Sequence, residues 1–68
     1  MRTGIDVQVE NHSSIWIITP VSKAAREWVY ENVEIEDHMR WGAGFAADWR
    51  QAQDIVEGMA QEGFKVVM

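Results

Sequence analysis

The sequence contains no cysteine and a single proline, and only 6 of its 68 residues are basic. Without cysteine, disulfide bonds and cysteine-based zinc sites are excluded, which is typical of proteins in a reducing compartment. No apolar run approaches the ~20 residues that a membrane-spanning helix needs, and residues 1–4 lead into an alternating pattern instead of the apolar stretch of a signal peptide. We therefore expect a cytoplasmic protein with no membrane segment.

The shortness of the chain limits what its core can supply. Residues 1–68 are expected to form a single domain, and below ~70 to 80 residues one core seldom contributes more than ~3 to 5 kcal/mol without a disulfide or a metal. A hydrophobic fraction of 47% with four tryptophans is enough for compact packing. Self-association, most simply as a homodimer, is expected to add stability.

The charge is unbalanced toward acid, with 11 acidic against 6 basic residues and a formal net charge of -5. Strong nucleic-acid binding is not expected, because it draws most of its free energy from Lys and Arg at phosphates. The basic residues are also scattered, whereas the acidic ones gather between Glu31 and Asp37. Acidity of this kind favours solubility and basic partners.

The first part of the chain is typical of a β-hairpin. Residues 5–10 alternate, with Ile5, Val7 and Val9 apolar and the residues between them polar. Residues 11–14, Asn-His-Ser-Ser, favour a turn, and residues 15–18, Ile-Trp-Ile-Ile, are apolar on both faces. We therefore predict two antiparallel strands, the second of them central.

A helix is predicted next. Pro20 ends the second strand and Ser22 is placed to cap a helix with an apolar stripe from Ala24 to Val33. Residues 34–38 lack a useful period and are acidic, which indicates an exposed loop.

The remaining pattern predicts a strand, a helix and a strand. Residues 39–47 have a period of two, and Asp48 stands three residues before Gln51 in the spacing of a capping box. An apolar helical face then runs from Trp49 to Ala60, Gly63 is placed to end that helix, and residues 64–68 favour a final strand.

Two helices and four strands in the order ββαβαβ predict an α+β fold. The expected form is a two-layer sandwich in which one four-stranded sheet carries both helices on one face. The order of the strands in the sheet is not determined by these patterns.

From Asn11 to about Val67 the chain resembles a family of short uncharacterised bacterial proteins common on prophages and plasmids. The resemblance is carried by Asn11-His12, Ser14-Ile15, Pro20, Ser22, Ala25, Arg26-Glu27-Trp28, Trp41-Gly42, Ile55 to Gly58 and Glu62-Gly63. It implies a mobile-element origin and no known activity. The Arg-Tyr usual at the start of the family's second helix is replaced here by Trp49-Arg50-Gln51.

Two histidines are the candidates for catalysis. His12 adjoins Ser13 and Ser14, and a triad would need only an acid such as Asp6 or Glu10, but all lie on or beside one hairpin, where a self-bonded turn is the simpler interpretation. His38 follows Glu36-Asp37, which suits a cation, although neighbours in one loop rarely converge on an ion. The sequence predicts no catalytic residue, no cofactor and no metal site.

The segment Trp41-Gly42-Ala43-Gly44-Phe45 has two glycines but lacks the lysine and spacing of a phosphate-binding loop. Gly42 and Gly44 are instead expected to let a backbone or a flat ring approach the sheet closely, and that partner can be internal.

The second strand suggests an interface. Because Trp16 lies between Ile15 and Ile17, one of these two sets must occupy the sheet face that the helices leave uncovered. An apolar centre within a rim of Asp6, Gln8, Glu10, Arg40 and Lys65 has the composition of a protein interface. The residues predicted to form it are Trp16, Ile18, Arg40, Gly42, Gly44 and Val67. A loop folded over that face is the alternative, and Arg26 with Tyr30 is a second possible contact.

These observations predict a non-enzymatic protein-interaction module of a phage or mobile element. An inhibitor of a host defence system, of the anti-CRISPR type, is one such module, whose acidic surface would compete for a basic nucleic-acid groove. The alternatives are a single-stranded nucleic-acid binder that uses exposed aromatic side chains, and a small histidine-dependent hydrolase.

Overall fold

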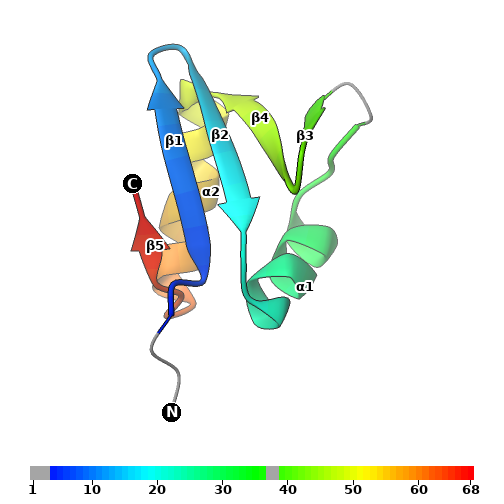
Figure 1. Cartoon of the computed structure of the whole chain (residues 1–68), viewed down its shortest axis with the longest axis vertical. Helices are drawn as coiled ribbons and strands as arrows, with labels where there is room; N and C mark the ends of the chain where they lie inside the picture. The colour runs from blue at the N-terminus through cyan, green and yellow to red at the C-terminus, as the bar shows by residue number, and fades with distance from the viewer. Residues whose placement is uncertain (1–3, 37–38) are drawn as a thin grey trace.

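The computed structural model describes residues 4–36 and 39–68, with Trp41 described by its backbone alone. The elements in chain order are β1 (Val7–His12), β2 (Ile15–Pro20), α1 (Lys23–Asn32), β3 (Arg40–Trp41), β4 (Gly44–Asp48), α2 (Trp49–Gln61) and β5 (Val66–Val67). The strands form one mixed sheet in the order β3-β4-β2-β1-β5, in which only β1 and β5 are parallel (Figure 1). The predicted α+β class, with one sheet and two helices, is confirmed.

Residues 39–47 form a hairpin instead of the single strand predicted. Arg40 pairs with Phe45 and Trp41 pairs with Gly44, so that Gly42 and Ala43 make a two-residue turn. Gly42 has φ +58°, and a positive φ at the first position of such a turn is the requirement of a type II′ hairpin. Over the described residues the order is therefore ββαββαβ, and their sheet has five strands instead of the four predicted.

The predicted ends of the helices are confirmed. The Ser22 hydroxyl accepts a hydrogen bond from the Ala25 N–H at 3.1 Å, and Oδ1 of Asp48 accepts one from the Gln51 N–H at 2.9 Å. At the end of α2, Gly63 has φ +89° and the Phe64 N–H donates to the Met59 carbonyl at 3.2 Å, the pattern of a Schellman stop. Short-range chemistry decides these boundaries.

One face of the sheet, called here the covered face, carries the core. Val9, Ile18 and Phe45 are paired across β1, β2 and β4, and paired residues point to the same side of a sheet. All three are buried in one cluster with α1 residues such as Val29 and α2 residues such as Met59. Figure 1 shows α2 behind β1 and β2, and α1 below the β3–β4 hairpin.

The other side, called here the uncovered face, is mixed in character. Its apolar residues are Ile15, Ile17, Ala46 and Val67, and its polar residues are Gln8, Glu10, His12, Thr19 and Asp48. The Ile15 side chain is 42% exposed and that of Val67 37% exposed, while Ile17 and Ala46 are partly buried. The polar row of β1 therefore separates Val67 from the apolar residues of β2 and β4 on this face.

Asp6 departs from its predicted place on the wet face of the first strand. It is only 4% exposed, and its Oδ2 accepts a hydrogen bond from the Lys65 N–H at 2.8 Å. Its carbonyl also accepts from the Val21 and Ser22 N–H groups. The carboxylate therefore ties the residue before β1 to the residue before β5.

Neither helix in the described part of the chain combines the length and the apolarity needed to cross a bilayer. The predictions that concern residues 1–3, Asp37 and His38 lie outside the described residues.

Candidate functional site

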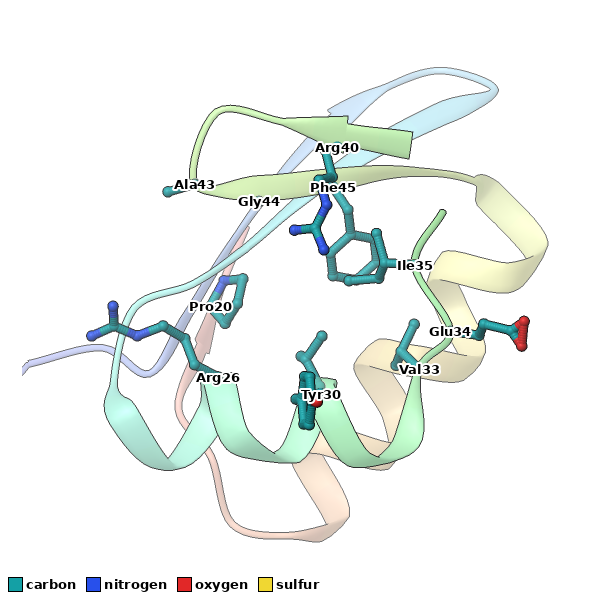
Figure 2. A pocket seen from close by; sticks show the side chains of 11 residues that line it. Pro20, Arg26, Tyr30, Val33, Glu34, Ile35, Arg40, Ala43, Gly44 and Phe45 are labelled. Carbon is teal, nitrogen blue, oxygen red and sulfur yellow. The ribbon is translucent and has the colours of Figure 1, made fainter. Parts of the chain in front are cut away.

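A pocket of about 530 Å³ lies between α1, residues 33–35 and the β3–β4 hairpin. Figure 2 shows it with the helix along one wall and the hairpin along the other. Each wall has a local cause. Ser22 caps the start of α1, and Gly42 turns the chain so that β3 folds back on β4. The pocket therefore exists because residues 39–47 are a hairpin instead of one extended strand.

The floor of the pocket is apolar. Phe45 is 1% exposed and Val29 is 4% exposed, and both belong to the main core. Val33 and Ile35, which follow α1, are partly buried and pack against the same cluster. In Figure 2 Val33 points toward the space between helix and hairpin. An apolar group that entered here would be in contact with the core.

Charged groups stand around this floor. Arg40 pairs with Phe45 across the hairpin, and Figure 2 shows its guanidinium directed into the space beneath β4. Arg26 lines the opposite edge from α1, and Figure 2 shows its guanidinium and the Glu34 carboxylate both pointing away from the centre of the pocket. The lining thus contains two arginines and one carboxylate in a protein with a net charge of -5. Locally the balance of charge is reversed.

Tyr30 stands at the mouth of the pocket and is 89% exposed. It also borders a neighbouring hollow on α1 together with Arg26 and Lys23. An aromatic ring held on a helix and left in water is poorly placed for stability, because its apolar area is not removed from solvent. The Arg26 and Tyr30 pair, a secondary contact in the sequence prediction, therefore lies where these two hollows adjoin.

The predicted interface residues do not share one surface. Trp16 is 8% exposed and Ile18 is fully buried, so both lie in the core and their assignment to the uncovered face is wrong. The reason is the register of the two strands. Val9 of β1 is paired with Ile18, and because paired residues face the same side of a sheet, burial of Val9 places Ile18 on the buried side as well. Ile15 and Ile17, the other pair of β2 residues considered for the uncovered face, are the residues that lie on it.

The other predicted interface residues are divided between two sides of the sheet. Arg40 lines the pocket, whereas Val67 is paired with Gln8 and lies on the uncovered face. A Cβ built on Gly44 would overlap the Ile18 carbonyl oxygen and lie 2.7 Å from Oγ1 of Thr19. The close approach predicted for this glycine is therefore made by β2 itself, and Gly42 serves the turn.

The hairpin around His12 has the geometry of a turn. Nε2 of His12 lies 3.6 Å from Oε1 of Glu10, and both side chains are more than half exposed. Ser13 has φ +68° and its N–H donates to Oδ1 of Asn11 at 2.9 Å, as in a self-bonded turn. Asp6 is at the far end of β1, roughly 20 Å away at the usual rise per residue. The self-bonded turn thus describes this segment better than a triad does.

Residues 4–36 and 39–68 contain no group of three or more His, Cys, Asp or Glu placed to hold a metal ion. Comparisons with family models, with curated proteins and with solved structures found no match to this chain. The interpretation of the site therefore depends on its own geometry.

Proposed function

We propose that this protein is a non-catalytic protein-binding module that docks a partner on the pocket between α1 and the β3–β4 hairpin. The observation that carries the proposal is a pocket whose partly buried apolar residues, Val33 and Ile35, lie over the buried core and beside the exposed ring of Tyr30. Tyrosine and arginine are enriched among the residues that dominate protein interfaces. Tyr30 with Arg26 and Arg40 supplies both types around one hollow.

The pocket is a better docking surface than the uncovered face expected from the sequence. On that face Ile15 and Ile17 are flanked by Glu10 and His12 across β1, so a partner would have to desolvate charged groups to reach these isoleucines. The proposal keeps the two-layer arrangement predicted from the sequence. It places the binding surface beside α1 on the covered face instead of on the uncovered face.

An inhibitor of a host defence nuclease, of the anti-CRISPR type, belongs to this functional class. A net charge of -5 supports it, because an acidic protein can steer toward and cover a basic nucleic-acid groove. The mobile-element resemblance of the sequence motivates the same proposal. Self-association as a homodimer remains a second proposal, and the mass of the protein in solution would decide it.

Single-stranded nucleic acid is the second candidate partner, favoured by one observation. The Arg50 guanidinium lies 5.3 Å from the ring centre of Trp49, which is 42% exposed, and aromatic rings beside arginine can stack on bases. The acidic charge opposes this binding.

A comparison of surface variants tests the proposed docking site. Tyr30→Ala should abolish capture of the specific partner from a bacterial lysate, while Trp49→Ala, an aromatic truncation away from the pocket, and Ile15→Ala, on the uncovered face, should retain it. The measurement is quantitative mass spectrometry of proteins bound to the tagged chain.

The same measurement can contradict the proposal. A partner kept by Tyr30→Ala but lost with Ile15→Ala would move the docking surface to the uncovered face. Loss with Trp49→Ala alone, accompanied by binding of single-stranded DNA at low salt, would favour the nucleic-acid alternative.

A further inference from the structure

The pocket pairs an apolar floor with a directed cation. Arg40 and Phe45 are cross-strand partners, so their side chains leave the hairpin on the same side. Figure 2 shows both side chains pointing from the hairpin toward α1, with the Arg40 guanidinium beside the Phe45 ring. A ligand group that contacts the Phe45 side of the pocket therefore has a guanidinium within its immediate surroundings.

The pocket has room for a large apolar side chain together with the residue next to it. About 530 Å³ is within the range of pockets that enclose small ligands. Val29, Val33 and Ile35 close the floor with branched aliphatic groups and offer no charged atom. A charged or strongly hydrated group would lose its water here without compensation, so the inner part of the occupant must be apolar.

The charged residues at the outer part of the pocket favour a negatively charged group on the bound partner. Arg40 already takes part in an interaction within the protein, but a guanidinium has five N–H donors in a planar fork and can serve more than one acceptor. Arg26 borders the opposite edge, and in Figure 2 its guanidinium and the Glu34 carboxylate both point away from the centre, so Arg40 is the charged group directed inward. Glu27 and Glu31 border the adjoining hollow on α1 and not this pocket.

We propose that the pocket recognises a partner segment in which an apolar side chain stands next to a carboxylate. The apolar side chain packs on Val33 and Ile35, and the carboxylate accepts hydrogen bonds from Arg40, with Arg26 as a more distant cation at the edge of the pocket. This inference rests on the proposed function, because it names the chemistry of the partner at the same site. An apolar side chain next to a lysine or arginine is rejected by the same two arginines.

Three blocked dipeptides test the apolar contact and the carboxylate contact separately. Acetyl-Phe-Asp-amide carries both features, acetyl-Phe-Asn-amide removes the charge with little change of shape, and acetyl-Ala-Asp-amide removes the ring. Titration into the isotopically labelled protein, followed by amide chemical shifts, should perturb Ile35 and Phe45 while leaving α2 unchanged. The Asn and Ala peptides should each bind at least about threefold more weakly than the Phe-Asp peptide.

Arginine variants identify the source of the selectivity. Arg40→Gln should bring the Asp and Asn peptides to similar affinity, and Arg26→Gln should narrow their difference. Arg50→Gln is the matched control, because Arg50 stacks on Trp49 in α2 and does not line the pocket, and it should leave the preference for Asp intact. Arg26, Arg40 and Arg50 are all exposed, so each variant is expected to fold, and the amide spectrum verifies this.

The outcomes are distinguishable from those for the proposed function. Equal affinity of the Asp and Asn peptides, or a preference for Asp that survives both pocket variants, would overturn the carboxylate recognition while leaving docking at the pocket possible. Absence of any shift at Ile35 and Phe45 with the phenylalanine peptides overturns this inference. The proposed function fails by a separate result, which is a partner that the Tyr30→Ala variant still captures.

Discussion

The two faces of the sheet differ by one residue step along each strand and yet have opposite roles. On the covered face Val9, Ile18 and Phe45 form a buried row across three strands. One step further, the row on the uncovered face contains Glu10, Ile17 and Ala46, of which the first is exposed and the others are partly buried. The strand β2 contributes an isoleucine to each row, so β2 alone does not distinguish the faces.

The difference teaches that neighbouring strands decide the orientation of a strand that is apolar on both sides. β1 has a single apolar side, and β4 places Phe45 on the side that meets the helices. Cross-strand pairing transfers these preferences to β2, because a shift of one residue would turn Val9 and Phe45 toward water. Ile18 is therefore buried for reasons that lie outside its own strand.

The largest expected effect comes from a matched pair of truncations in β2. Ile18→Ala should lower the free energy of unfolding by about 2 to 5 kcal/mol, because it opens a cavity in the covered face. Ile17→Ala should lower it by about 1 kcal/mol or less, because the residue faces the partly exposed side. Urea unfolding followed by tryptophan fluorescence measures both. Equal losses would mean that the two faces are not distinguished as described.

A smaller effect is expected at the closest approach between β4 and β2. Gly44→Ala should cost about 1 to 3 kcal/mol, because its new methyl group would overlap the Ile18 carbonyl oxygen. Gly4→Ala is the control, since nothing lies within 4 Å of a Cβ at that position, and its change should stay within about 0.5 kcal/mol. Thermal unfolding of the two variants checks this, and a tolerated alanine at Gly44 would refute the close approach.

The smallest expected effect concerns the turn that sets the register between β1 and β2. Ser13 has φ +68°, which is unfavourable for a residue with a Cβ, so Ser13→Gly should stabilise the protein by about 0.5 to 1 kcal/mol. Ser14 has no positive φ, and Ser14→Gly should instead destabilise by a similar amount through backbone entropy. Denaturation midpoints give the sign of each change. The same sign for both would contradict the turn geometry.

The elements bounded by local chemistry could be predicted from the sequence. Ser22, Asp48 and Gly63 act within a few residues of themselves, so their caps and stops did not depend on distant parts of the chain. The β3–β4 hairpin was missed although its signal was present. The alternation of residues 39–47 continues through the turn, and the two residues Gly42-Ala43 are long enough to reverse the chain only because Gly42 takes a positive φ.

The candidate site was predicted only in part. The stripe of α1 placed Arg26 and Tyr30 together on its outer side, and Arg40 was among the predicted contacts. The pocket itself depends on Phe45, which is far from α1 in sequence and reaches it through the sheet. No sequence spacing predicts that Phe45 and α1 lie side by side.

The sequence by itself determined the types of the secondary-structure elements and the helix ends, because periodicity and capping act between residues close in the chain. It also determined the absence of disulfides, because composition does not depend on how the chain folds. The tertiary structure alone decided which isoleucine of β2 is buried, that Asp6 joins β1 to Lys65, and that Arg40 stands above Phe45 beside α1. These outcomes depend on strand register and on contacts between residues remote in the chain. Such contacts contribute to stability only after the strands have paired.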